Sequence, residues 1–218
     1  MQPSLSRNAD PPLSASRTLT HRLWGFDLCE GLPYEVGQGV VAQRAELSRV
    51  RAFLSAEYPS LTEEAIHSAL QPGVDSAKRR YLETACDLIE LCHGGQIVGV
   101  MVGAPEDWAS YYIRIFAVKR SHQRPRLIRG FCRDYLFARL LEHGVQRVVA
   151  DTSPSNVATS RMLSELQFYV TGQQLSDRWG PLVRYTKFLD RACEKAFLKR
   201  FAGIAPPGSE GKRKEVGE

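Results

Sequence analysis

The first clear hydrophobic pattern in the chain has the period of an amphipathic helix. Between residues 45 and 58, four apolar side chains recur at helical spacing: Leu47, Val50, Phe53 and Leu54. A candidate strand over residues 39–45 precedes this helix. A shorter helix is predicted over residues 62–70, where Thr62 can act as the N-cap.

Between residues 86 and 120 the pattern changes to that of strands. Residues 86–108 predict two strands joined by a hairpin turn at Gly94-Gly95, and residues 110–120 predict a third long strand. The elements that follow are a helix over 127–144, a strand over 146–153, a helix over 155–168 and two strands within 169–189. This order predicts an α/β fold with a single mixed, mostly antiparallel central sheet flanked by helices.

The length and composition favour one domain with two tails. The chain has 218 residues, of which 43% are hydrophobic, so it can bury a sizeable core. Residues 1–20 are rich in Ser, Pro and Asn, and residues 203–218 consist mostly of Pro, Gly and charged residues. Such segments bury too little apolar surface to order themselves. We therefore expect disordered tails at 1–20 and 203–218, and a folded domain at 21–202.

The cysteines indicate a reducing compartment. Five are present, an odd number, and none is arranged in a CxxC or other metal-ligand spacing. We expect free thiols, no bound metal and a cytoplasmic location. The sequence also contains no apolar run long enough for a signal peptide or a membrane span, so no membrane association is expected.

The most unusual stretch is the basic turn, residues 118–130, which contains five Arg or Lys in thirteen residues. One interpretation is a solvated basic loop, and the other is a site for an anion. The net charge of +5 supports an affinity for anions only weakly. Nucleic-acid binding is a third interpretation, which we disfavour because the aromatic residues nearby belong to strand and helix patterns.

The position of the basic turn resembles a landmark of the GNAT N-acyltransferase superfamily. In that family, a central strand ends in a valine and is followed by a basic or polar turn that opens a helix. Here Val118 precedes the turn, and Pro154, Asn156 and Phe168 follow the next strand in the register that the family shows. The two landmarks lie about thirty residues apart, and the resemblance covers residues 86–190, about half of the chain.

The resemblance implies that the donor is an acyl thioester of pantetheine, either acetyl-CoA or a longer acyl-CoA. N–H groups at a helix start can bind a pyrophosphate, and the strand before the turn would separate from its neighbour and pair with the pantetheine amides. The residues that match the donor site of the family are Ala117, Val118, Gln123, Arg124, Arg126, Leu127, Ile128, Arg129 and Asn156. In relatives, the side chain at the position of Asn156 contacts pantetheine, and it can also cap the following helix.

The turn departs from the family pattern in one respect. Arg126 and Ile128 replace both glycines, and Pro125 has no N–H to offer. Arginine side chains can bind phosphate in bidentate fashion and replace the missing amides. A turn with fewer amides and more arginine also suits a donor carried on acyl carrier protein, through complementary charge, and we keep this as a hypothesis.

The positions that supply an acid and a base in many family members hold other residues here. Leu163 stands where a tyrosine acid is common, and Arg114 and Tyr112 stand where a glutamate base is common. The replacement candidates are Asp151, Tyr112 and Ser160. Asp151 is the first of these, because it matches a strand position that often carries a carboxylate near the acceptor. A structural ion pair is the alternative role for Asp151, and strand packing is the alternative role for Tyr112.

Two functional hypotheses follow from these residues. The first is an acyltransferase that moves an acyl group from a pantetheine thioester to an amine of a small molecule or a peptide. The second is a non-catalytic binding or docking module with the same fold, which the altered acid and base positions support. The acceptor, the length of the acyl chain and the oligomeric state stay open, with a homodimer as one alternative.

Overall fold

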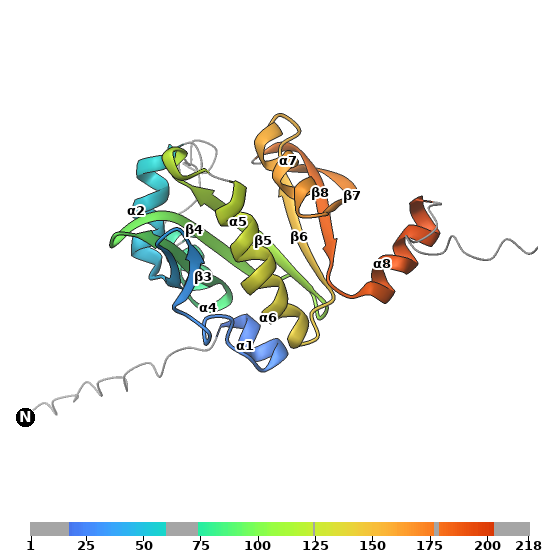
Figure 1. The fold of residues 1–218 in the computed structure, drawn as a ribbon, viewed down its shortest axis with the longest axis horizontal. Helices are drawn as coiled ribbons and strands as arrows, with labels where there is room; N and C mark the ends of the chain where they lie inside the picture. The colour runs from blue at the N-terminus through green and yellow to red at the C-terminus, as the bar shows by residue number, and fades with distance from the viewer. Residues whose placement is uncertain (1–17, 60–73, 124, 177–178, 203–218) are drawn as a thin grey trace, which may run out of the picture.

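The computed structural model describes residues 18–59, 74–123, 125–176 and 179–202 (Figure 1). Its centre is one sheet of eight strands in the order β1-β2-β3-β4-β5-β6-β8-β7. The strands are β1 (Tyr34–Gly37), β2 (Val40–Arg44), β3 (Asp87–His93), β4 (Gln96–Pro105), β5 (Ser110–Val118), β6 (Arg147–Thr152), β7 (Tyr169–Ser176) and β8 (Gly180–Phe188). Neighbouring strands are antiparallel except β5 and β6, which are parallel. The predicted mixed, mostly antiparallel sheet is confirmed.

The helices predicted near 45–58, 127–144 and 155–168 are present, whereas the helices that begin at Leu19, Val74 and Arg191 were not predicted from the sequence. The helices are α1 (Leu19–Trp24), α2 (Leu47–Glu57), α4 (Val74–Ala85), the 3₁₀ turn η1 (Arg120–His122), α5 (Pro125–Gly130), the π-helical η2 (Phe131–Leu136), α6 (Phe137–Glu142), α7 (Val157–Glu165), α8 (Arg191–Phe197) and the π-helical η3 (Leu198–Ala202). The helix predicted over 127–144 is the continuous run of α5, η2 and α6. The helix predicted over 62–70 lies outside the described residues. Because α1 begins at Leu19, the predicted N-terminal tail of residues 1–20 is too long at its C-terminal end.

Two apolar cores lie on the two faces of the sheet. The larger core joins the sheet to the segment after α1 and to α5, η2, α6 and α7, and includes Ile89 and Leu91 of β3. We call this side the α7 face. The smaller core lies under α2 and α4 and includes Leu88 of β3 and Ala117 of β5. We call this side the α2 face. The alternation along β3 and β5 between the two cores follows from the pleat of a strand.

The parallel pair at the middle of the sheet is short. β5 and β6 pair from Ser110–Arg147 to Ile113–Ala150, and beyond these four pairs the register contains no pairing between them. On the other side of β5, Gly103 faces Ile113 and Val102 faces Ile115, which makes Arg114 the extra residue of a β-bulge. A bulge bends its strand and increases the local twist. The separation of β5 from its neighbour that the sequence predicted is confirmed.

All five cysteines are free thiols, as predicted, and four of them are buried. None of the helices in the described ranges is both long enough and apolar enough to cross a bilayer.

Candidate functional site

A cavity of about 70 Å³ lies where β5 and β6 diverge. β5, β6, η2 and α7 form its walls. Most lining residues are apolar, among them Ile113, Phe116, Cys132, Ala150, Met162, Leu163, Leu166 and Phe168. Three polar residues complete the lining: Arg114, Asp151 and Thr159. An apolar space with a few polar groups is typical of a small-molecule site.

The second half of β5 presents a backbone edge to this gap. The N–H of Lys119 donates to the carbonyl of Val98 on β4, at 2.8 Å. Backbone N–H and C=O groups alternate in direction along a strand. Those of Phe116 and Val118 therefore point away from β4 and toward the gap. Buried backbone groups need hydrogen-bond partners. This edge therefore suits a ligand whose amides can pair with it as a strand would.

Two side chains hold the carbonyl of Val118 at the end of this edge. The hydroxyl of Tyr58, at the C-terminal end of α2, donates a hydrogen bond to it. The Nε2 atom of Gln123 lies 3.1 Å from the same carbonyl oxygen and 3.0 Å from the Tyr58 hydroxyl. The structure thus brings together Val118 and Gln123, two of the predicted donor-binding residues. A ligand amide must replace Tyr58 or Gln123 to bind this carbonyl, since a carbonyl oxygen has two lone pairs.

The basic turn begins with the 3₁₀ turn η1. Lys119 precedes η1, and the N–H of His122 closes that turn by donating to the Lys119 carbonyl at 2.8 Å. Arg120 is exposed. Two predicted phosphate ligands cannot be placed, because Arg124 and the side chain of Arg126 lie outside the described residues.

The remaining predicted donor residues have structural contacts of their own. The Leu127 side chain is 3% exposed and is not free to contact a ligand, whereas Ile128 is partly buried against the same core. Arg129 of α5 lies 3.4 Å from Glu165 of α7, which links the two helices beside the gap. The Ala117 side chain is buried in the α2-face core. For Ala117 and Leu127, any contact with a donor must therefore involve the backbone.

Asn156 lies at the other wall of the gap. It is the N-cap of α7, and its side-chain oxygen accepts a hydrogen bond from the N–H of Thr159 at 3.2 Å. The predicted capping role is confirmed. The side chain is exposed and keeps its amide N–H₂ group available for a ligand.

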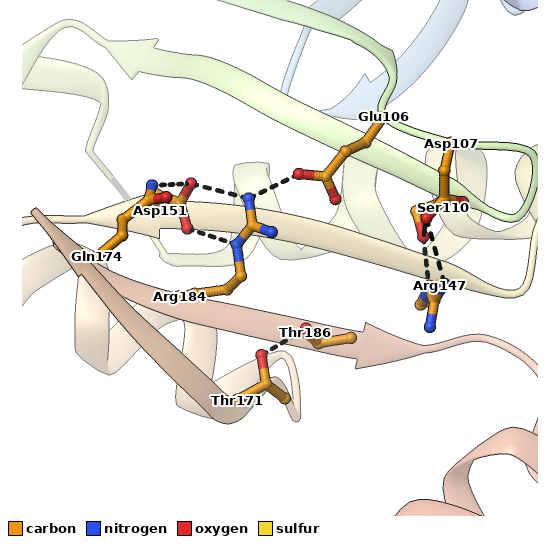
Figure 2. A network of polar contacts seen from close by, with 9 residues as sticks. All are labelled: Glu106, Asp107, Ser110, Arg147, Asp151, Thr171, Gln174, Arg184 and Thr186. Atoms are coloured by element: carbon orange, nitrogen blue, oxygen red, sulfur yellow. Dashed lines mark hydrogen bonds and ion pairs between the residues drawn. The ribbon is translucent and has the colours of Figure 1, made fainter. Parts of the chain in front are cut away.

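Asp151 is the centre of a polar network on the sheet (Figure 2). Its side chain is 3% exposed, and Oδ1 lies 3.1 Å from Nε of Arg184. Oδ2 accepts from Gln174 at 2.8 Å and from Arg184 at 3.3 Å. The same Nη2 atom of Arg184 that donates to Asp151 Oδ2 also donates to Glu106 at 2.6 Å. Asp151 thus has the ion pair that the sequence left open as its alternative role.

Tyr112 is part of the same network. Burial, the charge of Asp151 and the hydrogen bond that the hydroxyl donates to Asp151 raise the pKa of Tyr112 to about 12. The proton of this hydroxyl is therefore held and directed at Asp151. Ser160, the third predicted catalytic residue, lies on α7 next to the lining residue Thr159 but is not among the residues that line the cavity.

Sequence reasoning missed three residues that define this region. Tyr58 contacts the end of β5 from 60 positions away, and no local pattern indicates such a contact. Arg184 could have been identified from the sequence, because it is a charged residue within the alternating apolar pattern of the last strand. Thr159 follows Asn156 by three residues, and this spacing places it one helical turn into α7.

The fold was compared with known proteins. By sequence, no protein-family model and no curated protein matches the chain. By structure, it is similar to the acetyltransferase of Salmonella typhimurium that modifies the N-terminal serine of ribosomal protein L7/L12 (15% identity, TM-score 0.52, 72% of this chain and 98% of that one). The ribosomal-protein-S18-alanine N-acetyltransferase of Escherichia coli is similar to the same degree (14% identity, TM-score 0.52, 69% and 94% of the two chains).

A third similar structure contains the acyl donor. It is a GNAT family acetyltransferase from Elizabethkingia anophelis with acetyl-CoA bound (12% identity, TM-score 0.50, 70% of this chain and 99% of that one). Each of these proteins is matched over almost its whole length, by about 70% of this chain. The protein described here therefore has the fold of the GNAT acetyltransferases, as the basic turn and the Asn156 landmark predicted.

Proposed function

We propose that this protein is an N-acyltransferase that moves an acyl group from an acyl-CoA to an amine. The observation that carries the proposal is the gap between β5 and β6, with a backbone edge along β5, a cavity where the strands diverge and a basic turn at the end of β5. Pantetheine carries two amides that can pair with such an edge. The fold similarity to an acetyltransferase with acetyl-CoA bound supports the same donor.

In this proposal the residues of the chain act mainly by position. The edge at Phe116 and Val118 orients the pantetheine arm, and the cavity receives the thioester. The amine nitrogen attacks the thioester carbonyl carbon, the C–N bond forms, the C–S bond breaks, and the amine proton leaves to water or to the thiolate. Asp151 uses its acceptor capacity on Arg184, Gln174 and Tyr112, so solvent rather than this carboxylate takes the proton. Positioning of two reactants can by itself supply several kcal/mol, up to roughly 7–11 kcal/mol in well-oriented systems.

The proposal is tested by filling the cavity. Thr159 is half-buried and lines the cavity, so Thr159→Trp is expected to weaken the affinity for CoA and acetyl-CoA at least tenfold, measured by calorimetry. Arg161→Trp is the matched control, because the Arg161 side chain is 80% exposed on the same helix. It should leave the affinity unchanged.

Turnover is measured in parallel as free thiol released from acetyl-CoA and from longer acyl-CoAs in a mixture of amines. Wild-type protein without CoA affinity, or with affinity that Thr159→Trp does not change, would contradict the proposed site. Binding without thiol release would favour the non-catalytic module. The same assay with acetyl-acyl carrier protein at low salt tests the carrier-protein donor, since this donor presents the same pantetheine on an acidic protein surface.

A further inference from the structure

Arg114 lies at the point where the gap opens. It is the extra residue of the bulge in β5, directly after the last pair between β5 and β6. It also lines the cavity, beside Asp151 and Ile113. A bulge changes the direction of the side chain that it carries, and bulges often lie next to active sites. The position therefore places a permanent positive charge next to the proposed thioester.

Two tyrosine rings hold the guanidinium group of Arg114. Its Cζ atom lies 5.5 Å from the ring centroid of Tyr81 on α4 and 5.9 Å from that of Tyr112 on β5. Tyr112 is itself fixed by the hydrogen bond to Asp151. Contacts with aromatic rings use the flat faces of a guanidinium and leave its in-plane N–H donors available. The group is therefore oriented without using its hydrogen-bonding capacity.

Arg184, a second arginine in the same region, is paired with carboxylates. It is paired with Asp151 at 3.1 Å and with Glu106 at 2.6 Å. Arg114 is exposed and forms no ion pair within the described part of the chain. The charges of both arginines act to lower the pKa of Tyr112, against the larger effect of burial. An oriented cation at a cavity, with free donors and no carboxylate of its own among the described residues, is suited to an anion supplied by a ligand.

We propose that Arg114 binds a carboxylate of the acceptor, so that the acceptor is a small amine that also carries a carboxylate, such as an amino acid. This inference rests on the proposed N-acyl transfer and names the class of its acceptor. A guanidinium binds a carboxylate through two parallel N–H···O bonds, which fixes the orientation of the molecule that carries it. The amine of the same small molecule then lies beside the thioester in the cavity.

The test compares acceptors that differ only in the carboxylate. Free amino acids, their amides and the corresponding decarboxylated amines are acylated with acetyl-CoA, and kcat/KM is measured for each. Wild-type protein should prefer the free acids by about 10- to 100-fold, because hydrogen bonds between a guanidinium and a carboxylate are stronger than those to a neutral amide. Arg114→Met should reduce the ratio of kcat/KM for the free acids to that for the amides to about one. Arg114→Lys should restore part of the preference.

Two controls separate this inference from the proposed function. CoA affinity should be the same in Arg114→Met and in Arg79→Met, an exposed arginine of α4 that pairs with Glu83. Equal rates with acids and amides would overturn the inference and leave the transferase intact. Absence of both CoA binding and thiol release would refute the proposed function itself.

A binding measurement covers the case in which no acceptor in the panel reacts. In the presence of CoA, N-acetyl amino acids should raise the melting temperature of the wild-type protein at concentrations at least tenfold lower than N-acetyl amino amides. Arg114→Met should abolish this difference. Equal effects of acid and amide, or no effect of either, would overturn the inference.

Discussion

On the α7 face of the sheet, the buried carboxylate is Asp87, whereas the α2 side carries Glu90 and Asp151, each paired with an arginine. Asp87 is 1% exposed, and its Oδ2 accepts from the hydroxyls of Thr20 and Tyr111, at 3.0 Å for Tyr111. Its Oδ1 has no hydrogen-bond partner among the described residues. Glu90 lies three residues further along the same strand and receives Arg49 at 2.8 and 3.0 Å.

The difference reflects how water reaches the two faces. The helices of the α7 face and the sheet enclose a dry core, where an arginine would have to lose its hydration together with the carboxylate. On the α2 side, Arg49 and Arg184 have side chains that are 47% and 34% exposed, so each reaches a buried carboxylate while its outer part stays in water. On the α2 side, both buried carboxylates are thus paired with a partly exposed arginine, and Arg114 lies on the same side. The predictions below test this contrast, beginning with the largest effect.

The largest effect is expected when Arg184 is removed. Arg184→Leu leaves the Asp151 carboxylate buried without its counterion, and breaking a buried pair in this way costs about 3 to 5 kcal/mol. Because Arg184 is one-third exposed, we expect a loss near the lower end, about 3 kcal/mol in the free energy of unfolding. Urea denaturation measures it.

The control for Arg184 is the other carboxylate that it contacts. Glu106 is 30% exposed, so Glu106→Gln should cost less than about 1 kcal/mol. Adding Asp151→Asn to Arg184→Leu should recover most of the lost stability, because the uncompensated charge disappears. A double variant as unstable as Arg184→Leu alone would show that the guanidinium stabilises the sheet by packing and not by charge.

The fold could be predicted from the sequence because its signals are local. The hairpin at Gly94-Gly95, the strands around it and the helix after the basic turn all follow from the alternation of polar and apolar residues. The gap between β5 and β6 was predicted from the order of its landmarks, and the bulge that accompanies it was not. A bulge depends on the register with β4, which differs by one residue at Arg114 and has no signature in β5 itself.

The site could be predicted only in part, because its chemistry depends on contacts between distant segments. Asn156 was found from the resemblance to the family landmark and from its capping position, both of which are local in the sequence. The contact of Tyr58 with Val118 and the pairing of Asp151 with Arg184 join residues 60 and 33 positions apart. Whether a carboxylate is a free base or half of an ion pair is decided by such contacts, and residue type alone cannot decide it.

A smaller effect, visible as pH dependence, is expected from Asp87. Burial, which outweighs the hydrogen bonds from Thr20 and Tyr111, raises its pKa to about 6 in the folded protein. A carboxyl group whose pKa is raised by folding binds a proton more tightly in the folded state, so its contribution to stability increases as the pH falls. Between pH 7.5 and pH 5, this group should add roughly 1 to 2 kcal/mol, since one pKa unit corresponds to about 1.4 kcal/mol.

The measurement compares the wild type with Asp87→Asn, whose side chain has the same shape and does not ionise. The difference in unfolding free energy, wild type minus variant, should rise as the pH is lowered from 7.5 to 5. If the difference is flat across this range, Asp87 is not the buried carboxylate that the contrast between the faces requires.

The smallest effect is expected from Glu90, with the opposite sign. Burial acts to raise its pKa, but hydrogen bonds from Arg49 and Gln43 and the charge of Arg49 outweigh it, so the pKa lies below the usual value of 4.5. A lowered pKa means that the stabilisation is present above pH 4.5 and is lost as the pH falls through the folded-state pKa. Because Arg49 is half-exposed, Glu90→Gln should cost about 1 kcal/mol at pH 7.

The sign of this pH dependence is the sharper test. The difference between the wild type and Glu90→Gln should shrink below pH 4.5, whereas the difference for Asp87→Asn grows as acid is added. Both residues belong to β3, so a change in the strand itself would affect the two variants alike. Opposite slopes follow from the arginine that only Glu90 carries, and parallel slopes would contradict this contrast between the two carboxylates.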